Sequence, residues 1–205
     1  MKGKSPQLPS SSERLPLQKA LEKLSSSFNK WGLATKDYVL VDEFAYVLQG
    51  YEVKANEVES GHIDVYVNPD VLPWKDKGER SIIPPKDSIY MNGWVDFMQE
   101  TGYSLDMLRA TPAIFQIPTV NFTLPNGSEI KLMRAFEMTE AFVQQTLMHY
   151  SLEDVGKEKI IEWINKLKII KSAAEKKNDK KLAEFCSIKL TETKIKWQGI
   201  VPEIH

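Results

Sequence analysis

One carboxylate interrupts an apolar run in the first half of the chain, and it is the first group in the sequence that is suited to chemistry. The run is HIDVYV, residues 62–67, and the carboxylate is Asp64. Successive side chains of a β-strand point to opposite faces, so Asp64 points away from the face that Ile63, Val65 and Val67 bury. We therefore expect Asp64 to stand at the edge of a sheet and to face solvent or a ligand.

A histidine, His62, lies two residues before Asp64. Its neutral imidazole can ligate a metal ion, although magnesium prefers oxygen ligands. Two simpler interpretations stay open at this point. Asp64 can be a strand-end carboxylate that caps neighbouring backbone, and His62 can be a half-buried surface histidine.

Hydrophobic patterns predict the elements that position these two residues. Tyr38–Val41 has the composition of a buried strand, and a helix, a polar loop and a second strand, His62–Val67, are predicted after it. The apolar positions of that helix are Phe44, Ala45, Val47 and Leu48. Upstream, a stripe at spacings of three and four predicts a helix that ends near Gly32 and packs on the sheet. The stripe consists of Leu17, Leu21, Leu24, Phe28 and Trp31.

The rest of the chain alternates between loops, short strands and helices. Prolines make Asp70–Ser88 a long surface loop, whose basic residues either steer an anion or are simply solvated. Apolar residues on both sides of Gly102 predict a helix broken there, and two strand pieces follow it. The residues of the helix are Trp94, Val95, Phe97, Met98, Leu105, Met107 and Leu108, and the strand pieces are Phe115–Ile117 and Val120–Leu124.

An Asn-Gly turn at residues 125–128 then predicts a hairpin whose return strand is Glu129–Met133. The remaining residues predict helices with breaks near Gly156 and at Asn178-Asp179, and the last two helices form a hairpin. The fold class is therefore α+β, with a small mixed sheet that contains Tyr38–Val41, His62–Val67 and Glu129–Met133. We expect a mobile arm at 1–14, an α+β domain at 15–150 and a C-terminal helical segment at 151–205 that packs on it.

The segment Asp37–Pro69 resembles the nucleotidyltransferase superfamily, in particular its minimal, AbiEii-like and lincosamide-type members. The matching stretches are VDEF, residues 41–44, and SGHIDV, residues 60–65. In this family two small residues, Gly-Gly or Gly-Ser, follow the first strand, and two acids one residue apart lie on the second strand. The glycines let backbone amides approach a triphosphate. The acids hold the divalent ions that neutralise the α-phosphate and activate the attacking hydroxyl.

The resemblance implies site residues and also departures from the family pattern. Asp42 and Glu43 take the nucleotide-binding glycine positions, His62 takes the position of the first acid, and Asp64 matches the second. A third acid usually comes from a later strand, and the candidate here is Glu129. The implied metal ligands are Asp64 and His62, the implied catalytic residues are Asp64, His62 and Glu129, and the implied ions are magnesium or manganese.

Two carboxylates at a phosphate cradle add bulk and like charge, which disfavours a triphosphate in its usual position. We expect a negative groove beside Asp64 that binds divalent cations more readily than free nucleotides.

Three functions stay open. The first is transfer of a nucleoside monophosphate from an NTP to an unknown acceptor through an altered or lost site. The second is a non-catalytic binding module of the same fold, for example in a toxin–antitoxin-like or defence pair. The third is an unrelated α+β interaction protein.

Composition limits the remaining function classes. The chain has 205 residues, of which 42% are hydrophobic and 27% charged, so it can bury a proper core. A formal charge of −1 gives no whole-protein signal for nucleic acid or for an anionic membrane surface. The single cysteine, Cys186, cannot form an internal disulfide, and no apolar run reaches the roughly 20 residues that span a bilayer. We therefore expect a cytoplasmic protein without a membrane partner.

Overall fold

The computed structural model describes residues 14–53, 61–75 and 78–197. The predicted arm at 1–14 lies outside the described residues except for Arg14. The chain forms two compact units. The sheet unit comprises Met1–Ala45 and Ala55–Met133, and the helical unit comprises Tyr46–Lys54 and Arg134–His205. Each unit is described by itself below.

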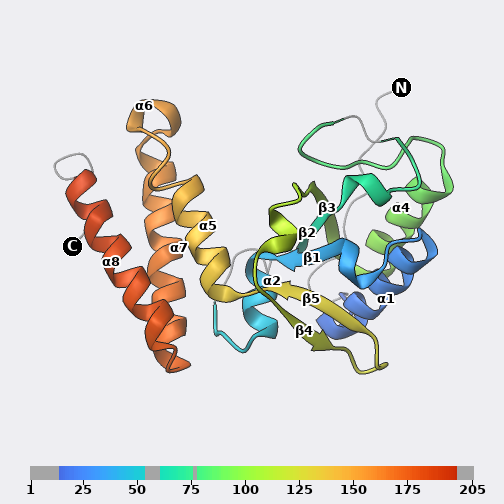
Figure 1. Ribbon diagram of the computed structural model, residues 1–205, viewed down its shortest axis with the longest axis horizontal. Helices are drawn as coiled ribbons and strands as arrows, with labels where there is room; N and C mark the ends of the chain where they lie inside the picture. The colour runs from blue at the N-terminus through green and yellow to red at the C-terminus, as the bar shows by residue number, and fades with distance from the viewer. Residues whose placement is uncertain (1–13, 54–60, 76–77, 198–205) are drawn as a thin grey trace. The chain divides into compact units, whose positions relative to one another are not determined.

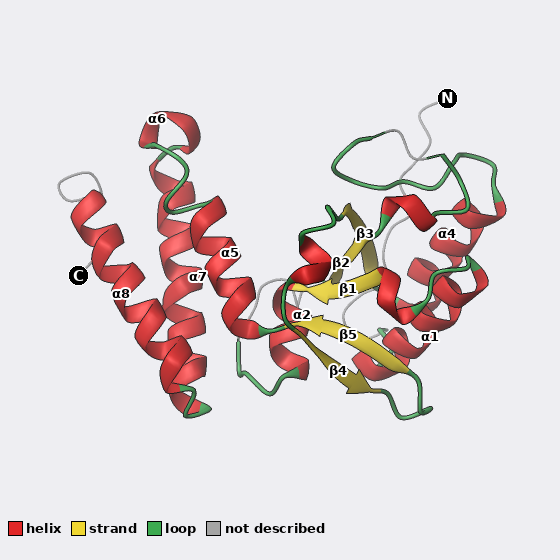
Figure 2. Ribbon diagram, in the orientation of Figure 1, coloured by secondary structure: helices red, strands yellow, loops and turns green. Residues whose placement is uncertain are grey.

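The sheet unit contains a mixed sheet with the strand order β3-β2-β1-β5-β4 (Figures 1 and 2). Its strands are β1 (Tyr38–Val41), β2 (His62–Val67), β3 (Ser104–Arg109), β4 (Thr119–Thr123) and β5 (Glu129–Met133). The pairs β1–β2 and β4–β5 are antiparallel, whereas β1–β5 and β2–β3 are parallel. The α+β class and the placement of the three predicted strands in one sheet are confirmed.

Three helices belong wholly or partly to this unit: α1 (Leu17–Lys30), α2 (Asp42–Leu48) and α4 (Ile89–Thr101). Short 3-10 turns, η2 (Thr35–Asp37), η3 (Pro69–Val71) and η4 (Ile114–Gln116), lie between the larger elements. The first helix ends at Lys30 with Trp31 as its C-cap, near Gly32 as predicted. The ring of Phe28 in α1 meets that of Tyr38 in β1 edge to face, with 4.8 Å between centroids, so α1 packs on the sheet as expected.

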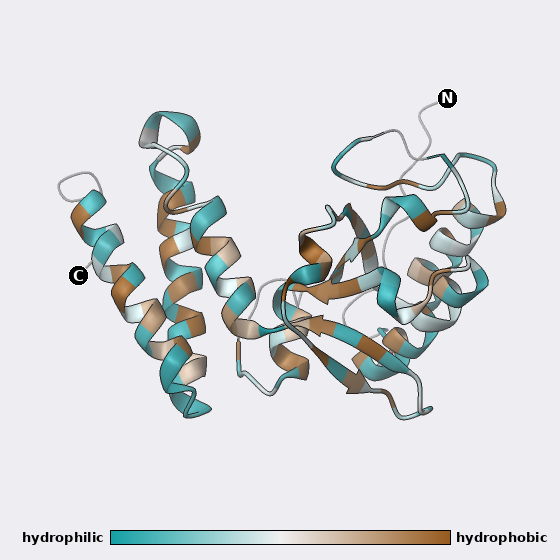
Figure 3. Cartoon of the chain, in the orientation of Figure 1, coloured by the Kyte–Doolittle hydropathy of each residue, from teal (hydrophilic) through white to brown (hydrophobic). Residues whose placement is uncertain are grey.

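The core lies around β1, whose four residues are all buried. On β2 the buried residues are Ile63, Val65 and Val67, while His62 is exposed and Asp64 and Tyr66 are half-buried. Brown segments, which mark hydrophobic residues, accordingly run through the strands of the sheet as well as the helices (Figure 3). The alternation along β2 confirms that one face of this strand is apolar and the other polar. The expectation that Asp64 stands at the edge of a sheet was wrong, because β2 lies between β1 and β3.

Two local predictions were wrong. Leu105, Met107 and Leu108 form part of β3 and not of a helix, because Gly102 adopts φ +75° and ends α4 in a left-handed cap. Leu105 and Met107 are the buried residues of an alternating strand pattern. The predicted strand piece Phe115–Ile117 instead overlaps the 3-10 turn η4. The N–H groups of Gln116 and Ile117 donate to the carbonyls of Ala113 and Ile114, within the turn, and not to another strand.

The loop Asp70–Ser88 is partly ordered by β3. Ser81 forms an antiparallel bridge with Leu108, and the Ile82 N–H donates to the Met107 carbonyl at 2.7 Å. Ile82 is buried. This stretch therefore covers part of the free edge of β3.

The helical unit consists of α5 (Ala135–Gln145), α6 (Leu152–Val155), α7 (Lys157–Lys176) and α8 (Lys180–Lys196), together with the end of α2. The predicted hairpin of the last two helices is confirmed. Its turn contains Asn178 at φ +61°, and Asp179 accepts a hydrogen bond from the Leu182 N–H as the N-cap of α8.

Residues 46–53 are tied to these helices by side-chain hydrogen bonds. The hydroxyls of Tyr46 and Thr139 lie 2.6 Å apart in a buried position, and the Tyr51 hydroxyl donates to Asp179 at 2.6 Å. The Lys177 ammonium lies 4.0 Å from the centroid of the Tyr51 ring. None of the helices within the described residues is long and apolar enough to cross a membrane.

One lysine fastens the segment between α5 and α6 to the end of α8. Lys196 Nζ donates to the carbonyl oxygens of Leu147, Met148 and Tyr150, at 3.0, 3.2 and 3.0 Å. Carbonyls beyond the end of a helix lack intrahelical partners, so a charged donor here satisfies three groups at once.

We expect Lys196→Met to lower the free energy of unfolding by about 1–2 kcal/mol, because the substitution keeps the apolar stem but removes the charged donor. Urea unfolding of the whole chain, followed by circular dichroism, measures this loss. Lys194→Met, in the same last turn of α8, is the matched control and should change stability by less than about 0.5 kcal/mol. Equal losses in the two variants would contradict the role of Lys196.

Candidate functional site

The polar face of β2 brings together part of the predicted site. Asp64 pairs with Val41, the last residue of β1, so it lies level with the turn that starts at Asp42. His62 lies two residues away on the same face of β2. The structure therefore places Asp64 beside the strand-to-helix turn, and His62 farther along the strand.

The neighbouring strand adds a carboxylate that the sequence analysis missed. In the parallel register of β2 and β3, Asp64 is paired with Asp106. Paired residues of adjacent strands point to the same face, about 5 Å apart. Asp106 is exposed and Asp64 is half-buried, so this face carries two adjacent carboxylates that solvent can reach.

His62 contacts residues of β3. Its Nδ1 lies 2.6 Å from the Ser104 Oγ and 3.6 Å from Asp106 Oδ2. The side chains of His62 and Asp106 are each about half exposed, at 46% and 55%. The imidazole is therefore held by β3 through Nδ1 while its ring stays open to solvent.

The turn between β1 and α2 has an unusual backbone. Asp42 adopts φ +59°, a left-handed conformation that favours glycine. Short polar residues such as Asp tolerate this region better than other side chains. The turn thus keeps a glycine-type conformation although its residue carries a carboxylate, and half-buried Glu43 follows it in the first turn of α2.

The pKa of the Tyr66 hydroxyl is affected by the charges around this face. Burial raises the pKa of its hydroxyl, the positive charge of Arg80 opposes the shift, and the negative charges of Asp64 and Asp42 add to it. Asp42 and Asp64 therefore both lie close enough to act on one hydroxyl. Arg80, from the segment beside β3, is the cation that acts on the same group.

Glu129 lies elsewhere on the sheet. Leu40 of β1 pairs with Leu132 of β5 in parallel, which sets Glu129 level with residue 37. Asp64 is level with Val41, at the other end of β1. Four residues of strand separate the two levels, about 13 Å. The structure does not bring Glu129 to the carboxylates of β2 and β3.

The donor atoms on this face decide whether it can hold a magnesium or manganese ion. Among the described residues, no group of three or more His, Cys, Asp and Glu side chains is placed to hold a metal ion. Magnesium, however, is commonly held by one or two carboxylates together with water and substrate phosphates. The pair Asp64 and Asp106 fits that second mode and not an all-protein cage.

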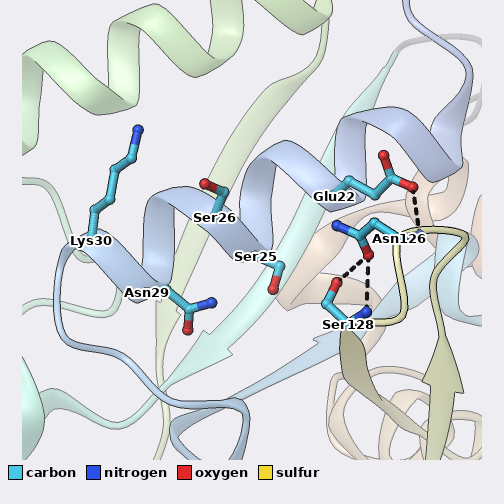
Figure 4. Close-up of a pocket in the computed structure, with 7 residues that line it drawn as sticks. All are labelled: Glu22, Ser25, Ser26, Asn29, Lys30, Asn126 and Ser128. Atoms are coloured by element: carbon cyan, nitrogen blue, oxygen red, sulfur yellow. Dashed lines mark hydrogen bonds between the residues drawn. The ribbon is translucent and has the colours of Figure 1, made fainter.

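A separate hollow lies between α1 and the β4–β5 turn. It has a volume of about 390 Å³ and is lined by Glu22, Ser25, Ser26, Asn29, Lys30, Asn126 and Ser128 (Figure 4). The Asn126 N–H donates to Glu22 Oε1 at 3.1 Å, and Ser128 donates to Asn126 Oδ1 (Figure 4). These groups already bond to one another, and Asp64, His62 and Glu129 do not line the hollow.

The alternation of Leu105 and Met107 around Asp106 was the signal that could have found this residue. The pattern repeats that of Ile63, Asp64 and Val65 on β2. No protein-family model, curated protein or solved structure that we compared with the chain matches it.

At the left-handed turn we expect a glycine variant to be more stable than an alanine variant, the reverse of the order inside a helix. We expect Asp42→Gly to be about 1 kcal/mol more stable than Asp42→Ala, because only glycine adopts φ +59° without strain. Asp96, in the interior of α4, is the matched control, where the Gly variant should be about 1 kcal/mol less stable than the Ala variant. Urea unfolding of the four variants measures both differences. The same sign at both positions would contradict the conformation of Asp42.

Proposed function

We propose that the chain is a nucleotidyltransferase-like protein with an altered site, which transfers a nucleoside monophosphate from an NTP to a hydroxyl acceptor. The observation that carries the proposal is the pairing of Asp64 with Asp106 beside the left-handed turn at Asp42. The resembled family has an acid and a glycine turn in these relative positions. The structure therefore supports Asp106, rather than Glu129, as the partner of Asp64.

The two carboxylates have oxygen donors suited to a hard divalent ion. Such an ion, when bound, neutralises charge on the transferred phosphoryl group and helps to activate the attacking hydroxyl. Asp64 and Asp106 would hold it, and Arg80 supplies positive charge near the same face for an anionic substrate. Asp42 and Glu43 keep a phosphate from the position that glycines leave open in the family, because their charges repel it.

One observation favours a second candidate, a non-catalytic binding module of the same fold. His62 stands where the family has its first acid, and its Nδ1 faces Ser104 and Asp106. Losing one carboxylate weakens a two-ion site, since each ion requires several oxygen ligands. On this reading the face binds a partner or a nucleotide without turning it over.

The proposal predicts that transfer depends on both carboxylates. We expect the wild type to transfer label from NTPs labelled at the α-phosphate to an acceptor and to release unlabelled pyrophosphate, in the presence of magnesium or manganese. RNA, aminoglycoside-like molecules and candidate proteins serve as acceptors. Asp64→Ala and Asp106→Ala should each lower the rate at least about a hundredfold, the scale of losing one electrostatic group at a reacting centre. Glu129→Ala, at the other end of β1, should leave the rate unchanged.

Two outcomes separate the candidates. Transfer that survives Asp64→Ala would contradict the proposed site. No turnover by the wild type, with NTP or cation binding that is lost in the same variants, would favour the binding module.

Restoring the missing acid predicts a gain of metal affinity. We expect His62→Asp to bind manganese at least about tenfold more tightly than the wild type, because a carboxylate replaces an imidazole beside Asp64 and Asp106. Calorimetry with manganese and with magnesium measures this change. His62→Asn, which removes the imidazole without adding charge, is the control. Equal affinities of the Asp and Asn variants would show that position 62 does not contribute to the cation site.

A further inference from the structure

A hydroxyl and an imidazole meet where β2 and β3 begin. Ser104 Oγ lies 2.6 Å from His62 Nδ1, and the two residues are paired in the register of the strands. The register places both on the face that also carries Asp64 and Asp106. A hydroxyl within hydrogen-bond reach of an imidazole nitrogen is the arrangement in which a base activates a nucleophile.

These residues do not form the triad of a serine hydrolase. In that triad the histidine contacts the serine with one ring nitrogen and the carboxylate with the other. Here Ser104 Oγ and Asp106 Oδ2 both face Nδ1, at 2.6 and 3.6 Å. The arrangement is a serine–histidine pair with a carboxylate beside it.

The hydroxyl also lies close to the carboxylate pair. Ser104 precedes Asp106 by two residues on the same strand, so it lies about 7 Å along the strand from that residue. Ser104 is half-buried and His62 is exposed, which leaves the pair accessible from the open face. An NTP whose phosphates face Asp64 and Asp106 would therefore bring its α-phosphorus near a hydroxyl of the protein itself.

We propose that Ser104 is an acceptor of the nucleotidyl group, so that the chain modifies itself. The inference rests on the proposed function, which supplies the NTP as co-substrate. Ser104 Oγ forms a bond to the α-phosphorus, and the bond from this phosphorus to the oxygen that bridges to the β-phosphate breaks. Pyrophosphate leaves with that oxygen, and His62 Nδ1 takes the hydroxyl proton. The product is a phosphodiester that joins Ser104 to the nucleoside.

The activated hydroxyl can be tested without NTP or metal. Diisopropyl fluorophosphate reacts with activated serines by forming an Oγ–phosphorus bond and releasing fluoride. We expect it to modify Ser104, located by peptide mass spectrometry, and to react at least about tenfold more slowly with His62→Gln, since a positioned base contributes about 10²–10⁴-fold. Ser81→Ala, opposite Leu108 at the same edge of β3, and His149→Gln, in the helical unit, should react like the wild type. Failure to modify Ser104, or equal rates with His62→Gln, would overturn the activation of this hydroxyl.

The acceptor is tested with α-labelled NTPs and manganese. We expect the wild type and Ser104→Thr to carry label on the peptide that contains residue 104, and Ser104→Ala to carry none. Pyrophosphate release shows whether only the self-modification fails or the proposed function fails as well. Asp64-dependent release with label on an added acceptor and none on residue 104 would overturn the self-modification and leave the proposed function standing. No pyrophosphate release from any NTP would overturn both.

Discussion

The burial of β1 on both faces is the constraint on which the sheet unit depends. Its four residues are 1%, 1%, 1% and 8% exposed, and its two edges pair with β2 and β5. A shift of β1 by one residue could draw Asp42, which follows it, into this enclosed position, where burying a charge is costly. Because β1 ends at Val41, the turn at Asp42 has a fixed position, and the register with β2 then sets Asp64 beside it. The location of the candidate site is thus decided by the packing of a strand that carries no polar residue other than a tyrosine.

The turn between β1 and α2 combines a glycine-type backbone with acidic side chains. The N-terminus of a helix has free N–H groups and a dipole that favours negative charge. In this chain the same turn carries two carboxylates of its own, at Asp42 and Glu43. Both residues belong to the first turn of α2, where the helix dipole favours negative charge. The turn is therefore acidic although its backbone has a glycine-type conformation at Asp42.

The sequence predicted those features of the fold that depend on local patterns. Alternation on β2, the Asn-Gly turn before β5 and the stripe of α1 each carry their own periodic signal, and all three are confirmed. Asp106 was missed because the apolar residues of β3, with Leu108 included, also have a spacing that suits a helix. The left-handed cap at Gly102, which ends α4, resolves the ambiguity. Glu129 was predicted as the third acid because it lies on a later strand. Its position relative to Asp64 depends on how the strands pair, and the register of pairing cannot be read from a single sequence. The contact between His62 and Ser104 joins residues 42 positions apart and depends on the same register.

Residues 46–53 belong to the helical unit, and this affects the order in which the parts of the molecule can fold. Tyr51 hydrogen-bonds Asp179, which is 128 residues farther along the chain, and Tyr46 meets Thr139 across 93 residues. During synthesis, which proceeds from the N-terminus, this segment emerges long before the helices that it joins. It must therefore remain without its final partners while the strands β2 to β5 are made. Contacts of such long sequence separation slow folding, so the closing of the helical unit around Tyr46 and Tyr51 is expected to be a late event on the ribosome.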